Sequence, residues 1–310
     1  MAGRLLILCP GQGAQHPAMF DLARTDPAAA RLLDEWRTDP TLAALLDSAT
    51  NGGAPLFSNR VAQPAIVAAT LATWTALRAS VPEPALVAGY SIGELAAYGV
   101  AGALPTGDLV RLAAERARIM VACVEEGTGQ AMVALSGMPD GSLDALLRRF
   151  GFHAAIVTGE DALVAGGPAQ ARQQLAEAAV AAGGRATVLP VEVASHTPLL
   201  RAAVAPFATL LKRQAWSTPA LPVLSGISAE KVDKAEHAIE VLSRQLAEPI
   251  RWMDCMDASV EAGITVALEL GPGAALARML QTRHPRIACR SVSEFRSLDG
   301  IRSWLGRELD

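Results

Sequence analysis

The sequence has few aromatic residues, few cysteines and no concentration of charge of either sign. Aromatic residues make up 4% and charged residues 19% of the 310 residues, and the formal net charge is −4. Without a lysine- and arginine-rich run, neither a nucleic-acid surface nor a polybasic membrane patch is expected. The four cysteines, Cys9, Cys123, Cys255 and Cys289, form no C-x-x-C pair, so no metal site is predicted. Reduced thiols are usual in the cytoplasm, where we expect this protein.

Long uninterrupted apolar runs are missing as well. The best candidate for a membrane span, 61–77, contains Gln63, Pro64 and three threonines, and it predicts a buried helix instead. The apolar run in the first ten residues is too short for a signal peptide and predicts a first strand. Apolar residues nevertheless make up 51% of the chain, with many alanines and leucines. That composition supplies a large core and favours helices.

Short apolar runs alternate with longer helical patterns over much of the chain. Buried strands are predicted over 4–10, 84–90, 221–227 and 265–273, and a helix is predicted to begin at about Ile92. Strands that alternate with helices indicate a mostly parallel sheet covered on both faces. The predicted fold class is therefore α/β.

The middle of the chain shows a different order of elements. It predicts a strand over 129–138, a helix over 141–150, two strands within 153–167, a helix over 169–183 and a strand over 185–194. This β-α-β-β-α-β order is the ferredoxin-like split motif. We therefore predict a small inserted domain over 127–192, within a discontinuous core formed by 1–126 and 193–310.

One serine lies in a pattern typical of a nucleophile. Residues 89–93, Gly-Tyr-Ser-Ile-Gly, fit G-x-S-x-G, which presents a serine from a sharp strand-to-helix turn. The flanking glycines supply the small side chains that such a turn requires. Ser91 would also lie beside the free N–H of Ile92 and the positive end of the helix dipole. The alternative is a chance match in a chain with 26 glycines.

A serine nucleophile requires a base, and the chain has five histidines. His237 and His284 lie in polar runs. His153 begins a predicted strand of the insert, and His16 follows the first glycine-rich turn. His196 lies where a predicted strand gives way to a helix, which suits either a base at the edge of the sheet or a helix cap. The residues alone leave both roles open.

One arginine is predicted to point inward. The polar face of the helix predicted over 107–120 is formed by Arg111, Glu115 and Arg118. Arg116 lies on the opposite, apolar face of that helix. A buried guanidinium requires a partner. That partner is either an internal carboxylate, such as Glu94 or Glu269, or a substrate carboxylate held by a two-pronged contact.

Several blocks of the sequence resemble one enzyme family. They are "PGQGAQ" (10–15), "GYSIGELAAYGVAGAL" (89–104), "AERARIM" (114–120), "VASH" (193–196), "EPIRW" (248–252) and "LELGPGAALARML" (268–280). They occur in the order found in malonyl-CoA:acyl-carrier-protein transacylases, and the resemblance spans nearly the whole chain. It implies an α/β-hydrolase-like core with a ferredoxin-like insert, in agreement with the order of elements.

The resemblance also implies roles for individual residues. It makes Ser91 the acylated nucleophile, His196 the base, the N–H groups of Gln12 and Ile92 the oxyanion hole, and Arg116 the site of the malonyl carboxylate. A backbone carbonyl orients the histidine in this family, and the match falls at Arg251, where the family usually has glutamine. No metal and no permanently bound cofactor are implied. Malonyl-CoA and CoA are substrate and product, and an acyl carrier protein is the partner.

One substitution and two segments indicate a subtype. Tyr90 stands where most of the family has histidine before the serine. Residues 89–104 and 291–305 look most like the malonyltransferase subunit of biotin-independent malonate decarboxylase. That subtype implies a carrier with a CoA-derived prosthetic group, together with the other decarboxylase subunits. The alternatives are a trans-acting malonyltransferase of fatty-acid or polyketide synthesis, a serine thioesterase or hydrolase, and a non-catalytic carrier-binding scaffold.

Overall fold

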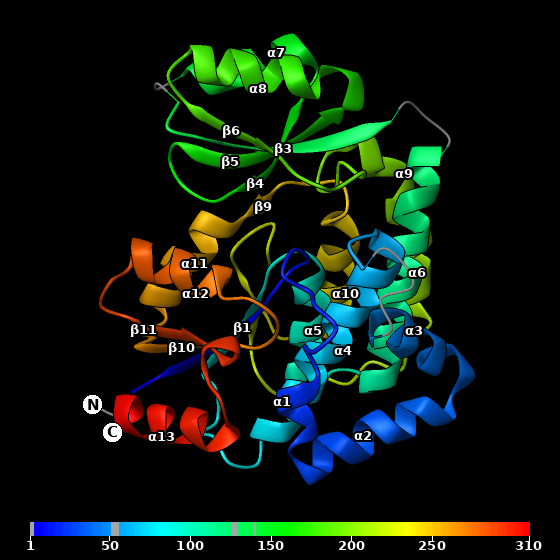
Figure 1. The fold of residues 1–310 in the computed structure, drawn as a ribbon, viewed down its shortest axis with the longest axis vertical. Helices are drawn as coiled ribbons and strands as arrows, with labels where there is room; N and C mark the ends of the chain where they lie inside the picture. The colour runs from blue at the N-terminus through cyan, green and yellow to red at the C-terminus, as the bar shows by residue number, and fades with distance from the viewer. Residues whose placement is uncertain (1–2, 51–55, 126–128, 139–140) are drawn as a thin grey trace.

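The computed structural model describes residues 3–50, 56–125, 129–138 and 141–310 (Figure 1). Within them, the larger sheet has the strand order β11-β10-β1-β2-β7-β8. These strands are β1 (Leu5–Cys9), β2 (Leu86–Gly89), β7 (Val223–Leu224), β8 (Lys231–Val232), β10 (Val266–Glu269) and β11 (Ala288–Ser291). All neighbouring pairs are parallel except β7 and β8. The predicted α/β class with a mostly parallel sheet is confirmed.

Helices cover both faces of the larger sheet. Leu6 and Leu8 of β1 pack in an apolar cluster with α11 (Trp252–Glu261) and α12 (Ala275–Arg283). Leu5 and Ile7, which point the other way, belong to the cluster that contains most of the remaining helices. Those helices are α1 (Asp21–Arg24), α2 (Pro27–Thr38), α3 (Pro40–Thr50), α4 (Asn59–Leu77), α5 (Ile92–Val100), α6 (Thr106–Glu125), α9 (Arg201–Lys212), α10 (Ala235–Arg244) and α13 (Leu298–Leu309). This burial on both faces explains why the strands are continuous apolar runs.

The segment 61–77 lies within α4 and is almost entirely buried, as predicted. It occupies the centre of the larger core rather than a surface. Among the described residues, no helix combines the length and hydrophobicity that crossing a bilayer requires.

The smaller sheet lies at the top of Figure 1 and has the strand order β6-β3-β5-β4-β9. Its strands are β3 (Gln130–Ser136), β4 (His153–Val157), β5 (Ala162–Pro168), β6 (Arg185–Val188) and β9 (Ile250–Arg251), and its helices are α7 (Ser142–Phe150) and α8 (Arg172–Ala181). The chain order β3-α7-β4-β5-α8-β6 is the predicted β-α-β-β-α-β order. It has an apolar core of its own, which includes Val133, Phe152 and Leu175.

Two features of the small sheet differ from the prediction. β9 belongs to the chain after the insert and pairs in parallel with β4, so the sheet extends beyond 127–192. β6 ends at Val188, earlier than the strand predicted over 185–194, because Pro190 has no N–H to continue the ladder. The predicted domain boundary at 126–127 lies outside the described residues.

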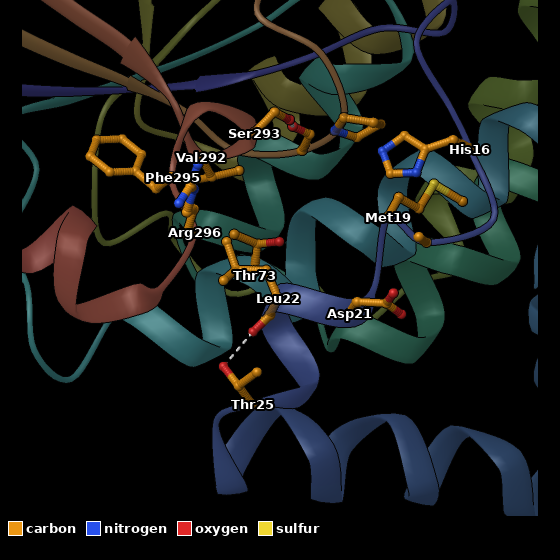
Figure 2. Close-up of a pocket in the computed structure, with 13 residues that line it drawn as sticks. His16, Met19, Asp21, Leu22, Thr25, Thr73, Val292, Ser293, Phe295 and Arg296 are labelled. Atoms are coloured by element: carbon orange, nitrogen blue, oxygen red, sulfur yellow. Dashed lines mark hydrogen bonds between the residues drawn. The ribbon is translucent and has the colours of Figure 1, made fainter.

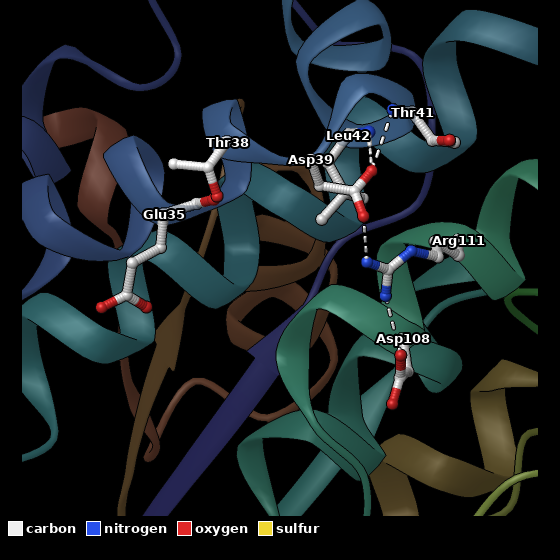
Figure 3. A network of polar contacts seen from close by, with 7 residues as sticks. All are labelled: Glu35, Thr38, Asp39, Thr41, Leu42, Asp108 and Arg111. Carbon is white, nitrogen blue, oxygen red and sulfur yellow. Dashed lines mark hydrogen bonds and ion pairs between the residues drawn. The ribbon is translucent and has the colours of Figure 1, made fainter.

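Helix α6 presents a polar outer face and an apolar inner face, as predicted. Its Arg111 donates to Asp108 at 2.8 Å and to Asp39, ahead of α3, at 2.6 Å (Figure 3). The Arg111 guanidinium thereby lowers the pKa of the Asp39 carboxyl. Arg116 lies on the inner face and is only 2% exposed. The Arg111 ion pairs lie on the outer face of α6, whereas the Arg116 guanidinium is directed into the core.

Candidate active site

Ser91 occupies a strained turn between β2 and α5. Its backbone has φ 57° and ψ −117°. A positive φ at a residue with a side chain costs on the order of 1–3 kcal/mol, so the surrounding structure must enforce it. A Cβ on Gly93 would lie 2.1 Å from the carbonyl oxygen of Cys9, and one on Gly89 would lie 2.2 Å from the backbone nitrogen of Glu94. Both glycines are therefore required by close backbone approach, as predicted.

The loop after β1 and the turn after β2 emerge at the same edge of the sheet. The two strands are parallel neighbours, and Cys9 lies opposite Gly89 at their carboxyl ends. The N–H of Ile92 lies in the first turn of α5, and the N–H of Gln12 lies in the β1 loop. Neither donates to an acceptor within the described part of the chain. This edge therefore offers free donors and a helix N-terminus beside Ser91.

His196 faces Ser91 directly. Its Nε2 lies 2.7 Å from the Ser91 Oγ, and its Nδ1 lies 2.6 Å from the carbonyl oxygen of Gln245. Because a carbonyl oxygen only accepts, Nδ1 carries the proton and Nε2 is free to accept the serine proton. Burial and, to a smaller extent, the charge of Arg116 lower the pKa of His196 to about 3. The imidazole is therefore neutral and in the tautomer that a base requires.

The predicted role of Arg251 is wrong. Its own backbone N–H donates to Gly226 at 2.7 Å, and its side chain pairs with Asp254 at 2.6 Å. The carbonyl that orients His196 belongs instead to Gln245, which caps the C-terminus of α10. The last carbonyls of a helix have no partner within it, so this one is available to the imidazole. The residue whose carbonyl orients His196 is thus a glutamine, as is usual in the family, and the departure expected at Arg251 does not arise.

Arg116 is a buried cation held by neutral groups. Its Nη1 donates to the Gln63 side chain at 2.7 Å, and its Nη2 donates to the Gln245 side chain at 3.2 Å. Among the described residues, no carboxylate forms an ion pair with it: Glu94 acts on it only through its charge, and Glu269 is not a partner. Burial lowers the pKa of Arg116 to about 10, so it stays charged at neutral pH. Such a group is ready to pair with a carboxylate from outside.

Gln245 connects the parts of this site. Its backbone carbonyl holds His196, its side-chain oxygen accepts from Arg116, and its side-chain amide donates to Glu94. The same Glu94 oxygen accepts from the N–H of Gly226 at 2.9 Å. Sequence reasoning missed Gln245, because a single glutamine near the end of an amphipathic helix carries no pattern. Only the fold shows that Gln245 is buried, and this burial of a polar side chain is what marks it as part of the site.

The other histidines do not face Ser91. His16 lines a separate cavity of about 370 Å³ together with Asp21 and Ser293 (Figure 2). His284 lies 2.8 Å from a carboxylate oxygen of Asp257. The remaining two are His153, exposed at the start of β4, and His237 on α10. Within the described residues, no group of three or more His, Cys, Asp or Glu side chains is arranged to hold a metal ion.

Tyr90, the residue before Ser91, packs between two elements. Its ring packs edge-to-face on Trp252, with 5.2 Å between the ring centroids. It also lies against the β1 loop, where a Cβ on Gly11 would come within 3.0 Å of the ring. Burial raises the pKa of its hydroxyl, so Tyr90 is neutral. It acts here as a packing residue between the loop of β1 and the start of α11.

Comparisons with known proteins identify the family of this chain. A family model described as acyl transferase domain matches residues 7–294. The malonyl CoA-acyl carrier protein transacylase of Mycobacterium tuberculosis is 31% identical over 301 residues, which cover 96% of this chain and 99% of that protein. The structure of the Coxiella burnetii malonyl CoA-acyl carrier protein transacylase has a TM-score of 0.91 at 25% identity, and the match covers 100% and 99% of the two chains. A type II polyketide acyl-carrier protein in complex with its malonyl-transacylase has a TM-score of 0.89 at 27% identity, with 97% and 99% covered.

The fold, the strained serine and these matches define the class: the chain belongs to the acyl transferase domain family. Its enzyme class is that of the malonyl-CoA:acyl-carrier-protein transacylases, with which it aligns along almost its entire length. The family resemblance found in the sequence is confirmed.

Proposed function

We propose that this enzyme moves a malonyl group from malonyl-CoA to the prosthetic-group thiol of an acyl carrier protein, through an ester on Ser91. The observation that carries the proposal is Arg116, a buried cation with two amide partners and no carboxylate partner among the described residues. A malonyl thioester brings the missing carboxylate. An acetyl thioester brings no carboxylate to the guanidinium, which keeps only its two amide partners, and this disfavours acetyl binding relative to malonyl.

In the first half-reaction, the Ser91 Oγ attacks the thioester carbonyl while its proton passes to His196 Nε2. The N–H groups of Ile92 and Gln12 bind the oxyanion, and donors in this role are typically worth about 3–4 kcal/mol each. Collapse of the intermediate breaks the carbon–sulfur bond, and His196 returns the proton to the CoA thiolate. The malonyl group is then held as an ester on Ser91.

In the second half-reaction, the carrier thiol gives its proton to His196 and its sulfur attacks the malonyl ester. Ser91 leaves and recovers the proton from the imidazole. Arg116 affects the same base, because its charge is one cause of the low pKa of His196. A malonyl carboxylate on Arg116 offsets that charge and makes His196 a stronger base. The substrate with the free acid therefore improves its own catalysis.

The acceptor we propose is the carrier of a malonate decarboxylase, with a CoA-derived prosthetic group and the other decarboxylase subunits as assembly partners. The support is the resemblance of residues 89–104 and 291–305 to that subunit, together with Tyr90. A carrier of fatty-acid or polyketide synthesis is the second candidate. It is favoured by the names of the similar proteins, one of which is seen in complex with its carrier.

An acceptor screen tests both the formation of a malonyl ester on Ser91 and the choice of carrier protein. The protein is incubated with malonyl-CoA and weighed intact, and the modified peptide is mapped. We expect one malonyl group on Ser91. Each type of holo-carrier is then added in turn, and we expect faster transfer to the decarboxylase carrier. Release of free malonate in place of transfer would indicate a hydrolase, and absence of any mass gain would indicate a non-catalytic scaffold.

A further inference from the structure

The proposed mechanism leaves Glu94, a fully buried carboxyl one turn after Ser91, without a role. One of its oxygens accepts from Gly226 and Gln245, and the other has no hydrogen-bond partner within the described residues. We propose that Glu94 takes up a proton from solvent when a malonyl carboxylate pairs with Arg116, so that binding of this acyl group is linked to protonation. The inference rests on the proposed function, because it requires a malonyl carboxylate at Arg116.

Charge balance in a buried network is the basis of this inference. Gln245 joins Arg116 to Glu94, since its oxygen accepts from one and its amide donates to the other. In the free enzyme the positive charge of Arg116 stabilises the Glu94 carboxylate. A malonyl carboxylate would pair with that cation and place a second negative charge in the same network. An uncompensated buried charge is costly, and a proton on Glu94 removes it.

Among the described titratable groups around Glu94, only Glu94 itself changes its protonation state near neutral pH. Burial raises the pKa of Glu94 to about 7. Tyr98 on α5 and Cys255 on α11 have their pKa values raised by burial and by Glu94, so both are neutral. His196 is neutral because burial lowers its pKa to about 3. Within the described part of the chain, Arg116 on α6 is the charged side chain that acts on Glu94.

The direction of the pH dependence follows from linkage. Below the pKa of Glu94 in the free enzyme, the carboxyl already carries the proton, and malonyl affinity is highest and independent of pH. Above that pKa, binding must bring a proton with it. The Kd of malonyl-CoA then rises by up to about tenfold per pH unit until the pKa of the bound state is passed. Acetyl-CoA has no free carboxylate, so its Kd lacks this dependence.

Titration calorimetry on a Ser91→Ala variant measures the proton directly, because this variant binds malonyl-CoA without reacting. Binding enthalpies are compared between buffers of different ionisation enthalpy at about one pH unit above the pKa of Glu94, where this carboxyl is mostly ionised in the free enzyme. We expect malonyl-CoA to take up more protons than acetyl-CoA, by an excess that approaches one. The acetyl-CoA arm removes any contribution from the phosphates of CoA, which both ligands share.

Two further substitutions in the Ser91→Ala background identify the acceptor of the proton. Glu94→Gln should abolish the excess uptake. Glu269→Gln is the matched control, since Glu269 is also buried, has a pKa raised to about 7 and has one oxygen without a hydrogen-bond partner among the described residues. That variant should keep the excess. If Glu94→Gln fails to fold, equal proton uptake with the two ligands would still overturn the inference.

Equal proton uptake for malonyl-CoA and acetyl-CoA, or an excess that persists in Glu94→Gln, would overturn the inference while leaving the proposed function intact. Absence of malonyl-CoA binding would overturn both. An excess that is lost in Glu94→Gln and retained in Glu269→Gln would support proton-linked binding through Glu94.

Discussion

The two sheets of this enzyme differ in how deeply their strands are buried and in what they contribute to the candidate site. Strands β1, β2 and β10 of the larger sheet are buried along their whole length, whereas β6 of the smaller sheet is mostly exposed. The strained Ser91 and the loop of Gln12 lie at the carboxyl edge of the larger sheet. A sheet fixed on both faces can hold a residue in an unfavourable backbone conformation, which a sheet with one open face does less well.

The smaller sheet contributes through its connections rather than through its strands. The chain that leaves β6 leads to His196, whose backbone N–H donates to Leu246 at 2.9 Å. Leu246 follows Gln245, and β9 comes shortly after it in the chain. His196, the proposed base, is thus positioned where the two layers join. The position of the Ser91 Oγ depends on the larger sheet. The alignment of His196 Nε2 with that oxygen depends on the junction between the two layers.

The largest effect should come from the nucleophile itself. Ser91→Ala should reduce malonyl transfer by roughly 10⁶-fold, as loss of a catalytic serine does elsewhere, while leaving the fold unchanged. Malonyl-carrier formation and a circular dichroism spectrum measure the two effects. Ser48→Ala on α3 is the control and should transfer at the normal rate. Substantial transfer by Ser91→Ala would mean that the ester forms on another residue.

The next effect concerns the rigidity of the larger sheet. Gly93→Ala should cost several kcal/mol of unfolding free energy, because the new Cβ would lie 2.1 Å from a backbone oxygen. The control is Gly306→Ala on α13, where the new methyl meets no atom of the described residues within 4 Å. That substitution should stabilise the helix by roughly 0.5–1 kcal/mol. Equal midpoints in urea denaturation of the two variants would contradict the packing argument for the turn.

A substitution in the smaller core should have a local effect. Phe152→Ala removes a ring from the separate cluster of the insert and should cost about 3–5 kcal/mol within that unit. Hydrogen exchange should therefore speed up in β3 and β5 while β1 and β2 stay protected. Uniform loss of protection in both sheets would show that the two layers unfold as one, and would remove the distinction drawn between them.

The smallest effect should come from the outer face of α6. Arg111→Ala removes partly exposed ion pairs to Asp39 and Asp108, which are worth about 1 kcal/mol or less. The loss should shrink as salt is added, since these pairs are accessible to solvent. Thermal denaturation at low and high salt measures it. A large, salt-independent loss would show that these contacts hold α6, and with it Arg116, in place.

Much of this architecture could be predicted from the sequence because local rules and the fold agree there. The strand before Ser91 is continuous and apolar since it is buried on both faces, and Arg116 points inward because helical spacing places it there. Other features depend on contacts that no local pattern encodes. The family resemblance points to Arg251 as the partner of His196, whereas the end of α10 brings the carbonyl of Gln245 to the imidazole. The strand β11 was not predicted, because its residues alternate in burial and include a charged arginine.

The central claim is that Ser91 and Arg116 act on opposite ends of one acyl group. Acylation of the wild-type enzyme and of Arg116→Ala, followed by intact mass with malonyl-CoA and with acetyl-CoA, tests it most directly. The account predicts that malonyl loading falls by about 100-fold, as loss of charge-assisted hydrogen bonds implies, and that acetyl loading falls far less. An unchanged ratio of malonyl to acetyl loading would contradict it.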